Sequence, residues 1–165
     1  MDTTVSMPSF SPLRIPTRGL PWWKKVKHAF SRRQWVMDHD YTLYLPWLNA
    51  TILIPKGFIF DGASVPRIFW PILDPVGILL IGSIFHDFGY VYGFLLDENH
   101  NKVFDNVSRA FVDRQIRDIN TYINGTFILN ELAWLVLRIF GCFVWANYRK
   151  CKRDVFKDLN ITTRG

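Results

Sequence analysis

The sequence predicts an α+β protein, in which a short antiparallel β-meander packs on a unit of three longer α-helices. Residues 34–60 are rich in β-branched and aromatic residues and are interrupted by turns, which is typical of short strands. Residues 76–93, 105–123 and 127–152 contain longer runs with the apolar content of helices. Of the 165 residues, 49% are hydrophobic and 16% aromatic, so one domain can build a sizeable core.

We expect three regions along the chain. Residues 1–30 form an arm rich in proline, aromatic and basic residues. Residues 31–152 form a single α+β domain, with the meander in 31–60 and the helical unit in 61–152. Residues 153–165 form a C-terminal tail.

The arm has prolines at intervals of four or five residues, a spacing that argues against a helix and favours an extended chain: Pro8, Pro12, Pro16 and Pro21. The end of the arm interleaves Trp22, Trp23 and Phe30 with lysines and arginines. Two interpretations stay open. The arm is an anchor on a membrane surface or on nucleic acid, or it packs on its own domain or on a neighbouring subunit.

The secondary structure follows from turn and cap signals. Strands are expected around residues 35–38, 41–45, 51–54 and 58–60. The first long helix covers about residues 76–93, with Asp74 as its cap, and the second begins at Asp105 or Asn106 and ends at Asn124-Gly125. The third covers about residues 127–152, and its apolar content is close to that of a membrane span. Glu131 and Arg138 interrupt it, which is costly in lipid. Three alternatives remain: a transmembrane helix, a buried core helix, and an interfacial or oligomer-facing helix.

Charge and cysteine content limit the partners and the compartment. The net charge of +6 favours anionic partners such as phosphate groups, anionic lipid, nucleic acid or an acidic protein face. On a continuous helix, Cys142 and Cys151 would lie about 13 Å apart, too far for a disulfide. No cysteine–histidine spacing suits zinc, and the first ten residues lack the features of a signal peptide. We therefore expect a reducing compartment.

The densest set of reactive side chains lies between Phe58 and Tyr90. His86, Asp87 and Tyr90 follow an almost wholly hydrophobic run, which should bring them to the edge of the core. On a helix, His86 and Tyr90 share a face, whereas His86 and Asp87 point about 100° apart and are not expected to form an ion pair. This arrangement suits His86 acting on a water molecule and Asp87 binding a metal or a cationic group.

Asp113, on the next helix, is the expected partner of His86, because a carboxylate among core positions needs a partner across the helix pair. The same three residues could equally be a structural network in which Asp113 bonds His86 and Tyr90 completes the cluster. A Ser64–His86–Asp triad is a weaker alternative, since Ser64 lacks the G-x-S-x-G surroundings of a nucleophile elbow and fits a helix cap better.

The pattern F-x-x-D-G-A-S-V-P-R, then H-D-F-G-Y, then a D-R pair at Asp113-Arg114 resembles a small domain family of uncharacterised function. The resemblance covers about residues 34–145. Members of that family occur mainly in bacteriophages and prophages, so the resemblance implies a phage or prophage origin. It implies no activity.

The five residues H-D-x-x-Y, at His86–Tyr90, are also similar to the active-site helix of secreted calcium-dependent phospholipases. That resemblance implies His86 as the base that activates water, Asp87 as a calcium ligand, Tyr90 as a support and Asp113 as the orienting carboxylate. The disulfides and the glycine-rich calcium loop of that family are absent here, unless the loop from Asp61 to Ser64 replaces the latter.

Two functions are therefore expected as alternatives. The first is a phage-encoded metal-assisted hydrolase, in which His86 deprotonates water, Asp87 and Asp61 hold calcium or magnesium, and Arg67 and Ser64 bind substrate. The second is a noncatalytic virion, tail or assembly component. Its partners would be other phage proteins or further copies of itself, bound through the arm and the third helix; anionic lipid is a further candidate and nucleic acid a weaker one. The expected location is the virion or the infected bacterial cytoplasm, with or without contact to a membrane surface.

Overall fold

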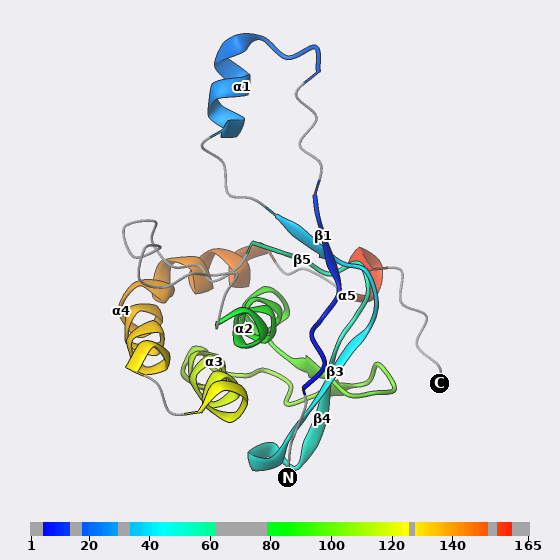
Figure 1. Cartoon of the computed structure of the whole chain (residues 1–165), viewed down its shortest axis with the longest axis vertical. Helices are drawn as coiled ribbons and strands as arrows, with labels where there is room; N and C mark the ends of the chain where they lie inside the picture. Colours follow the sequence, from blue (N-terminus) through cyan, green and yellow to red (C-terminus); the bar gives the residue numbers. More distant parts are fainter. Residues whose placement is uncertain are drawn as a thin grey trace.

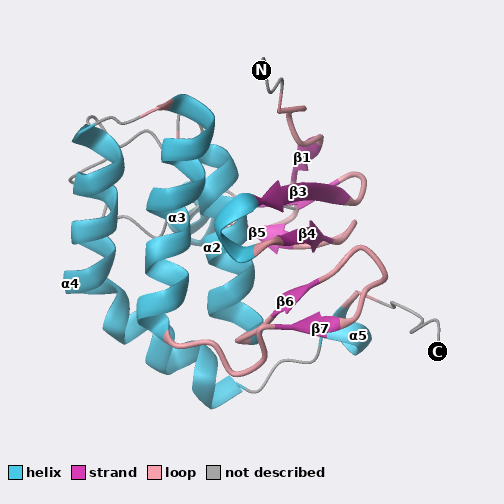
Figure 2. Cartoon of the chain, turned by 90° about the horizontal axis from the view of Figure 1, so that it is seen from below, coloured by secondary structure: helices cyan, strands magenta, loops and turns pink. Residues whose placement is uncertain are grey.

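The computed structural model describes residues 5–13, 18–29, 34–61, 79–125, 128–151 and 155–159. Strands and helices are both present, as the α+β prediction requires (Figure 1). Helices α2 (Leu80–Tyr92), α3 (Arg109–Asn124) and α4 (Ile128–Cys151) lie side by side, and the strands collect beside α2 and α3, on the side away from α4 (Figure 2). A short helix, α5 (Val155–Asp158), follows α4.

The prediction of one β-meander in residues 34–60 is wrong, because the strands are divided between two antiparallel sheets. One sheet has the order β1-β2-β5, with β1 at Phe10–Pro12, β2 at Trp35–Met37 and β5 at Ile59–Phe60. The other has the order β3-β4-β6-β7, with β3 at Tyr41–Leu45, β4 at Ala50–Ile54, β6 at Leu95–Leu96 and β7 at Lys102–Val103.

The division falls between Met37 and Tyr41, where two aspartates bond other segments of the chain. Asp38 accepts hydrogen bonds from the hydroxyls of Ser9 and Ser11, at 3.1 and 3.0 Å. Asp40 accepts one from the backbone N–H of Lys56, at 2.7 Å. These side-chain bonds replace a continuous ladder, so the chain leaves one sheet and enters the other.

The hairpin of β3 and β4 agrees with the sequence prediction. Tyr41 pairs with Ile54 and Leu45 with Ala50, and β3 alternates between buried and exposed side chains. A short 3₁₀ turn at Pro46–Leu48 connects the strands, and Asn49 closes it in the left-handed conformation that asparagine tolerates. The buried face of the hairpin packs in the same core as α2.

The proline spacing of the arm wrongly excluded a helix there. Helix α1 (Trp22–Ala29) begins directly after Pro21, whose carbonyl accepts the backbone N–H groups of Lys24 and Lys25. Proline is compatible with the start of a helix, so Pro21 limits α1 without preventing it. The preceding segment, β1, pairs with β2, and this part of the arm therefore belongs to a sheet of the domain.

Helix α2 passes through the centre of the fold, and all of its residues are buried. It approaches α3 closely because Gly82 and Gly89 present no side chain. A Cβ atom at Gly82 would lie 2.6 Å from the amide of Asn120, and one at Gly89 would lie 2.8 Å from a methyl of Val112. The small residues of the apolar run thus set the distance between the helices that carry the polar cluster described below.

The predicted limits of the long helices are close to those observed. Helix α3 begins after Ser108, whose hydroxyl accepts the backbone N–H of Phe111 at 3.1 Å, rather than at the predicted cap Asp105 or Asn106. Both of those residues precede the helix, and Asn106 has a positive φ of 54°. The predicted cap Asp74 and residues 76–78 of the first helix lie outside the described residues.

Helix α4 has a buried face and an exposed apolar face. Ala133, Val136 and Leu137 are buried, while Ile139 and Phe143 are 56% and 74% exposed. Within the described residues it is the one helix long and apolar enough to cross a membrane, with 28% of the relevant window buried. The prediction of a core helix therefore holds for one face.

Candidate functional site: a buried histidine–aspartate network beside an acidic pocket

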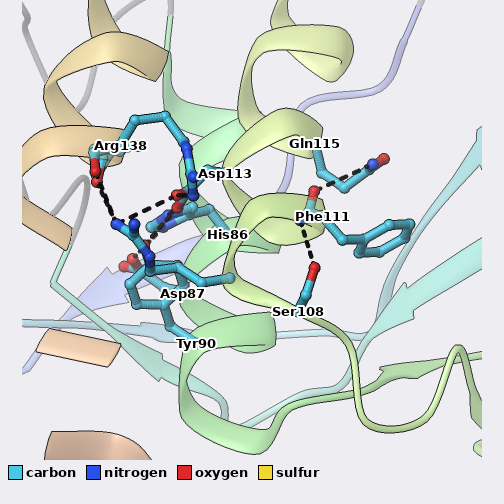
Figure 3. Close-up of polar contacts among 10 residues, drawn as sticks. His86, Asp87, Tyr90, Ser108, Phe111, Asp113, Gln115 and Arg138 are labelled. Atoms are coloured by element: carbon cyan, nitrogen blue, oxygen red, sulfur yellow. Dashed lines mark hydrogen bonds and ion pairs between the residues drawn. The ribbon is translucent and has the colours of Figure 1, made fainter. Parts of the chain in front are cut away.

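Three helices bring the reactive side chains together at one place. Helix α2 supplies His86, Asp87 and Tyr90, α3 supplies Asp113, and α4 supplies Arg138 (Figure 3). The rings of His86 and Tyr90, four residues apart on α2, lie 4.0 Å apart between their centroids.

Asp113 is the centre of this network and is fully buried. One of its oxygens lies 3.2 Å from Nε2 of His86 and also accepts a hydrogen bond from the hydroxyl of Tyr90. The contacts that the sequence predicted between Asp113 and both of these residues are therefore present. A buried carboxylate is stable only with such partners, since burying an unpaired charge is costly.

The other oxygen of Asp113 faces two arginines, which the sequence prediction missed. Nη1 of Arg138 lies 3.0 Å away and Nη1 of Arg109 lies 3.8 Å away. Arg109 also donates to the backbone carbonyls of Leu137 and Arg138, so it connects α3 to α4. A signal was present in the sequence, because an arginine within the apolar run of α4 requires an anionic partner.

His86 and Asp87 do approach each other, contrary to the prediction from their adjacency on the helix. Nδ1 of His86 lies 3.5 Å from Oδ1 of Asp87. The side chains leave the helix about 100° apart, but both are long enough to turn toward each other in the same buried space. His86 thus lies between two carboxylates, with Asp113 at one ring nitrogen and Asp87 at the other.

The close contacts shift the pKa values of all three groups. Burial alone would lower the pKa of His86, but the hydrogen bonds and charges of Asp113 and Asp87 outweigh it and raise that pKa. Burial raises the pKa of Asp87 to about 7, against the opposing hydrogen bond from His86 and with support from the nearby charge of Asp61. Burial would raise the pKa of Asp113, yet its bonds to His86, Tyr90 and Arg138 lower it. A protonated His86 between two carboxylates, 3.2 Å from Asp113 and 3.5 Å from Asp87, fits the direction of its pKa.

Asp87 connects the network to a pocket of roughly 150 Å³, here called the acidic pocket. Asp61 and Asp87 are the charged residues among those lining it, and Gln34, Phe60 and Tyr148 are among the others. Asp87 is 6% exposed, and its Oδ2 atom has no hydrogen-bond partner among the described residues. The structure therefore brings together the two residues predicted as metal ligands.

The remaining predicted site residues fall into two groups. His86 is fully buried and is not among the residues lining the acidic pocket, so the predicted contact between its ring and a water in a cleft is not found. The reason is that both ring nitrogens are directed at carboxylates. Ser64 and Arg67 lie outside the described residues.

Two carboxylates are a small donor set for a metal ion. No group of three or more histidine, cysteine, aspartate or glutamate side chains suited to a metal occurs within the described ranges. Calcium and magnesium, however, accept backbone carbonyls, waters and substrate oxygens as ligands, and magnesium is commonly held by only one or two carboxylates. The acidic pocket fits these hard cations better than zinc, which prefers nitrogen and sulfur.

Fold and site together define an α+β protein in which a buried histidine–aspartate network adjoins an acidic pocket. The chain belongs to the family described as protein of unknown function (DUF1353), whose model matches residues 35–136. Membership in an uncharacterised family, implied by the sequence resemblance, is thus confirmed; the link to phages stays a prediction. No curated protein and no solved structure matches the chain. The matched range contains the polar residues on α2 and α3, whereas Arg138 lies just beyond it.

Proposed function

We propose that the protein is a cation-assisted ester hydrolase, with the acidic pocket as its reaction site. The observation that supports this most is Asp87, a carboxylate that lines the pocket together with Asp61 and has one buried oxygen without a hydrogen-bond partner among the described residues. Two ionised carboxylates that share a pocket repel each other, and either a proton on one of them or a cation between them relieves that repulsion. A divalent cation held there would supply a Lewis acid for an ester carbonyl or lower the pKa of a bound water.

In this proposal the buried residues position the pocket rather than touch substrate. Asp113 and Tyr90 hold the ring of His86, and Nδ1 of His86 lies 3.5 Å from a carboxylate oxygen of Asp87. Since the raised pKa of His86 favours its protonated form, His86 orients Asp87 instead of taking a proton from water. Hydrolysis joins a water oxygen to the ester carbonyl carbon and breaks the C–O bond to the alcohol, which takes a proton. The roles of Arg67 and Ser64 in substrate binding remain predictions.

The activity can be tested with the full chain and soluble short-chain esters, including a phospholipid below its micelle concentration. We expect turnover that requires millimolar calcium or magnesium, stops with EDTA, and falls at least tenfold in Asp87→Asn. His86→Gln should weaken cation binding by roughly 10–100-fold, as loss of a group that orients a metal ligand does. Asp97→Asn, in an exposed turn, is the control. No turnover by the wild type with calcium, magnesium or manganese would contradict the proposal.

A second candidate function, a noncatalytic phage assembly component, is favoured by the exposed apolar face of α4. Five of its side chains are exposed by 76%, 47%, 56%, 44% and 74%: Ile128, Leu135, Ile139, Phe140 and Phe143. At roughly 200 Å² a side chain, these exposures leave roughly 600 Å² of apolar surface on each copy. A symmetric pair would bury roughly 1,200 Å², at the lower end of stable interfaces. In this case, the buried network only braces the three helices.

Sedimentation and light scattering would distinguish this candidate. A dimer of the wild type that dissociates in Ile139→Glu or Phe143→Glu, together with no turnover, would support the assembly function. A monomer at all concentrations would contradict an interface between copies on α4.

A further inference from the structure

Helix α1 stands apart from the rest of the molecule. In Figure 1 it lies at one end of the long axis, away from the sheets and from α2, α3 and α4. It makes no substantial packing contact with any described helix or strand. Most of α1 therefore faces solvent, although it begins with two tryptophans.

The segments before and after α1 are held together by the pairing of β1 with β2. β1 and β2 are antiparallel, with Pro12 opposite Trp35, and the backbone N–H of Leu13 donates to the carbonyl of Gln34 at 2.8 Å. The aromatic contacts of Phe10 with Trp35 and Phe60 hold these strands in the domain. A segment anchored at both ends in this way can carry a helix away from the core without unfolding it.

The exposed side chains of α1 are large and apolar. Trp22 is 76% exposed, Trp23 55% and Val26 46%. A helix on the surface of a domain normally buries its apolar side, because removing that area from water is favourable. Here the described part of the domain leaves these three side chains largely uncovered, so a partner that accepts apolar groups is required.

Helical geometry separates the apolar residues from the basic ones. At about 100° per residue, Trp22, Val26 and Trp23 occupy one arc of the helix, and Lys24 and Lys25 lie outside that arc. No acidic residue occurs in the first turn of α1, and the chain carries a net charge of +6. A short helix with tryptophan on an apolar face and lysine on a separate polar face is typical of helices that lie in the interface of a membrane.

The position of the lysines outside the apolar arc favours lipid over nucleic acid as the partner of α1. Proteins that bind single-stranded nucleic acid place aromatic and cationic side chains in the same groove, because the bases stack while the phosphates are neutralised beside them. On α1, Lys24 reaches the edge of the arc, with Nζ 5.2 Å from the ring of Trp23. Lys25 lies outside the arc, and Val26 within it has no ring on which a base could stack. An apolar arc that enters the headgroup layer, with lysines at the level of the phosphates, accounts for all five residues.

We propose that α1 docks the protein on the surface of bilayers that contain anionic phospholipid. Trp22, Trp23 and Val26 enter the interface, and Lys24 and Lys25 contact the negative surface. This proposal concerns binding alone and does not depend on hydrolase activity.

Flotation of the full chain with phosphatidylcholine vesicles, with and without phosphatidylglycerol, tests the proposal. We expect binding to the anionic vesicles and at least tenfold weaker binding to neutral ones, with the difference reduced by high salt. The double variant Trp22→Ala/Trp23→Ala should bind anionic vesicles at least tenfold more weakly, and Lys24→Gln/Lys25→Gln about tenfold more weakly. Unchanged thermal melting of both variants would show that the fold is intact.

Phe143→Ala, which removes an aromatic side chain of similar exposure from α4, is the matched control and should change binding by less than about twofold. The proposal is overturned if the wild type ignores anionic vesicles, if the Trp22→Ala/Trp23→Ala variant binds them as the wild type does, or if Phe143→Ala alone abolishes binding. Binding of an oligonucleotide that depends on the same residues, without vesicle binding, would also overturn it and assign α1 to nucleic acid.

Discussion

Replacing Asp113 with asparagine should strongly destabilise the fold, although the two side chains have the same shape. Asp113 is fully buried and carries the negative charge faced by His86, by Arg138 at 3.0 Å and by Arg109 at 3.8 Å. The amide oxygen of the asparagine could still accept the Tyr90 hydroxyl beside His86, but its NH₂ group would then face the donors of Arg138 and Arg109. Breaking one side of a buried charged network typically costs about 3–5 kcal/mol, and we expect a loss in this range.

Equilibrium urea unfolding at neutral pH, followed by tryptophan fluorescence, measures this loss. Asp118→Asn on the same helix is the matched control, since Asp118 pairs with Arg117 near the surface, with side chains 25% and 29% exposed. That change should cost less than about 1 kcal/mol. In a double-mutant cycle, Asp113→Asn and His86→Gln should couple by about 1–3 kcal/mol. A loss below about 1 kcal/mol for Asp113→Asn, or additive effects in the cycle, would refute the role of Asp113 as the centre of the network.

Four further predictions concern the same residues. Because the folded pKa of Asp87, about 7, lies above its ordinary value of 3.8, the wild type should lose stability as pH rises from about 4 to 7. Asp87→Asn should remove a cost that is about 2–3 kcal/mol larger at pH 8 than at pH 5, measured by melting without divalent cations. Millimolar calcium should stabilise the wild type and not this variant, and equal stabilisation of both would place the cation elsewhere. A Cβ at Gly141 would lie 2.5 Å from the Tyr90 hydroxyl, so Gly141→Ala should destabilise by about 1–3 kcal/mol, whereas Cys142→Ala, exposed on the next position, should be nearly neutral. Arg138→Met should cost more in urea unfolding than Arg114→Met, since Arg114 is exposed and Arg138 bonds Asp113; equal losses would show that the Arg138 bond contributes little.

The sequence predicted the fold well where periodicity and turn chemistry determine it. The β3–β4 hairpin, the three long helices and the meeting of His86 with Asp113 follow from local patterns and from the need of a buried carboxylate for a partner. The division into two sheets could not be predicted from local patterns. It depends on β6 and β1, which pair with distant strands through only one to three residues. Short pairings at long separation leave almost no periodic signal.

The candidate site was predicted in its residues and only in part in its geometry. The bonding of Asp113 to His86 and Tyr90 could be predicted from the sequence. The approach of His86 to Asp87 could not, because it depends on side-chain rotation within a buried space. Arg138 was overlooked because its run was judged for membrane spanning, although a lone arginine among apolar residues on a helix also indicates a buried anionic partner. The helix in the arm was missed because a proline before a helix was treated like a proline within one.

Crystals grown with manganese, which takes the oxygen ligands of calcium and magnesium and scatters anomalously, test the central proposal most directly. The proposal predicts an anomalous peak in the acidic pocket within about 2.0–2.6 Å of carboxylate oxygens from both Asp61 and Asp87, and its absence from crystals of Asp87→Asn. An empty pocket at saturating manganese, with the Asp87 carboxylate still lining it, would contradict cation binding there and leave the histidine–aspartate network with a structural role alone.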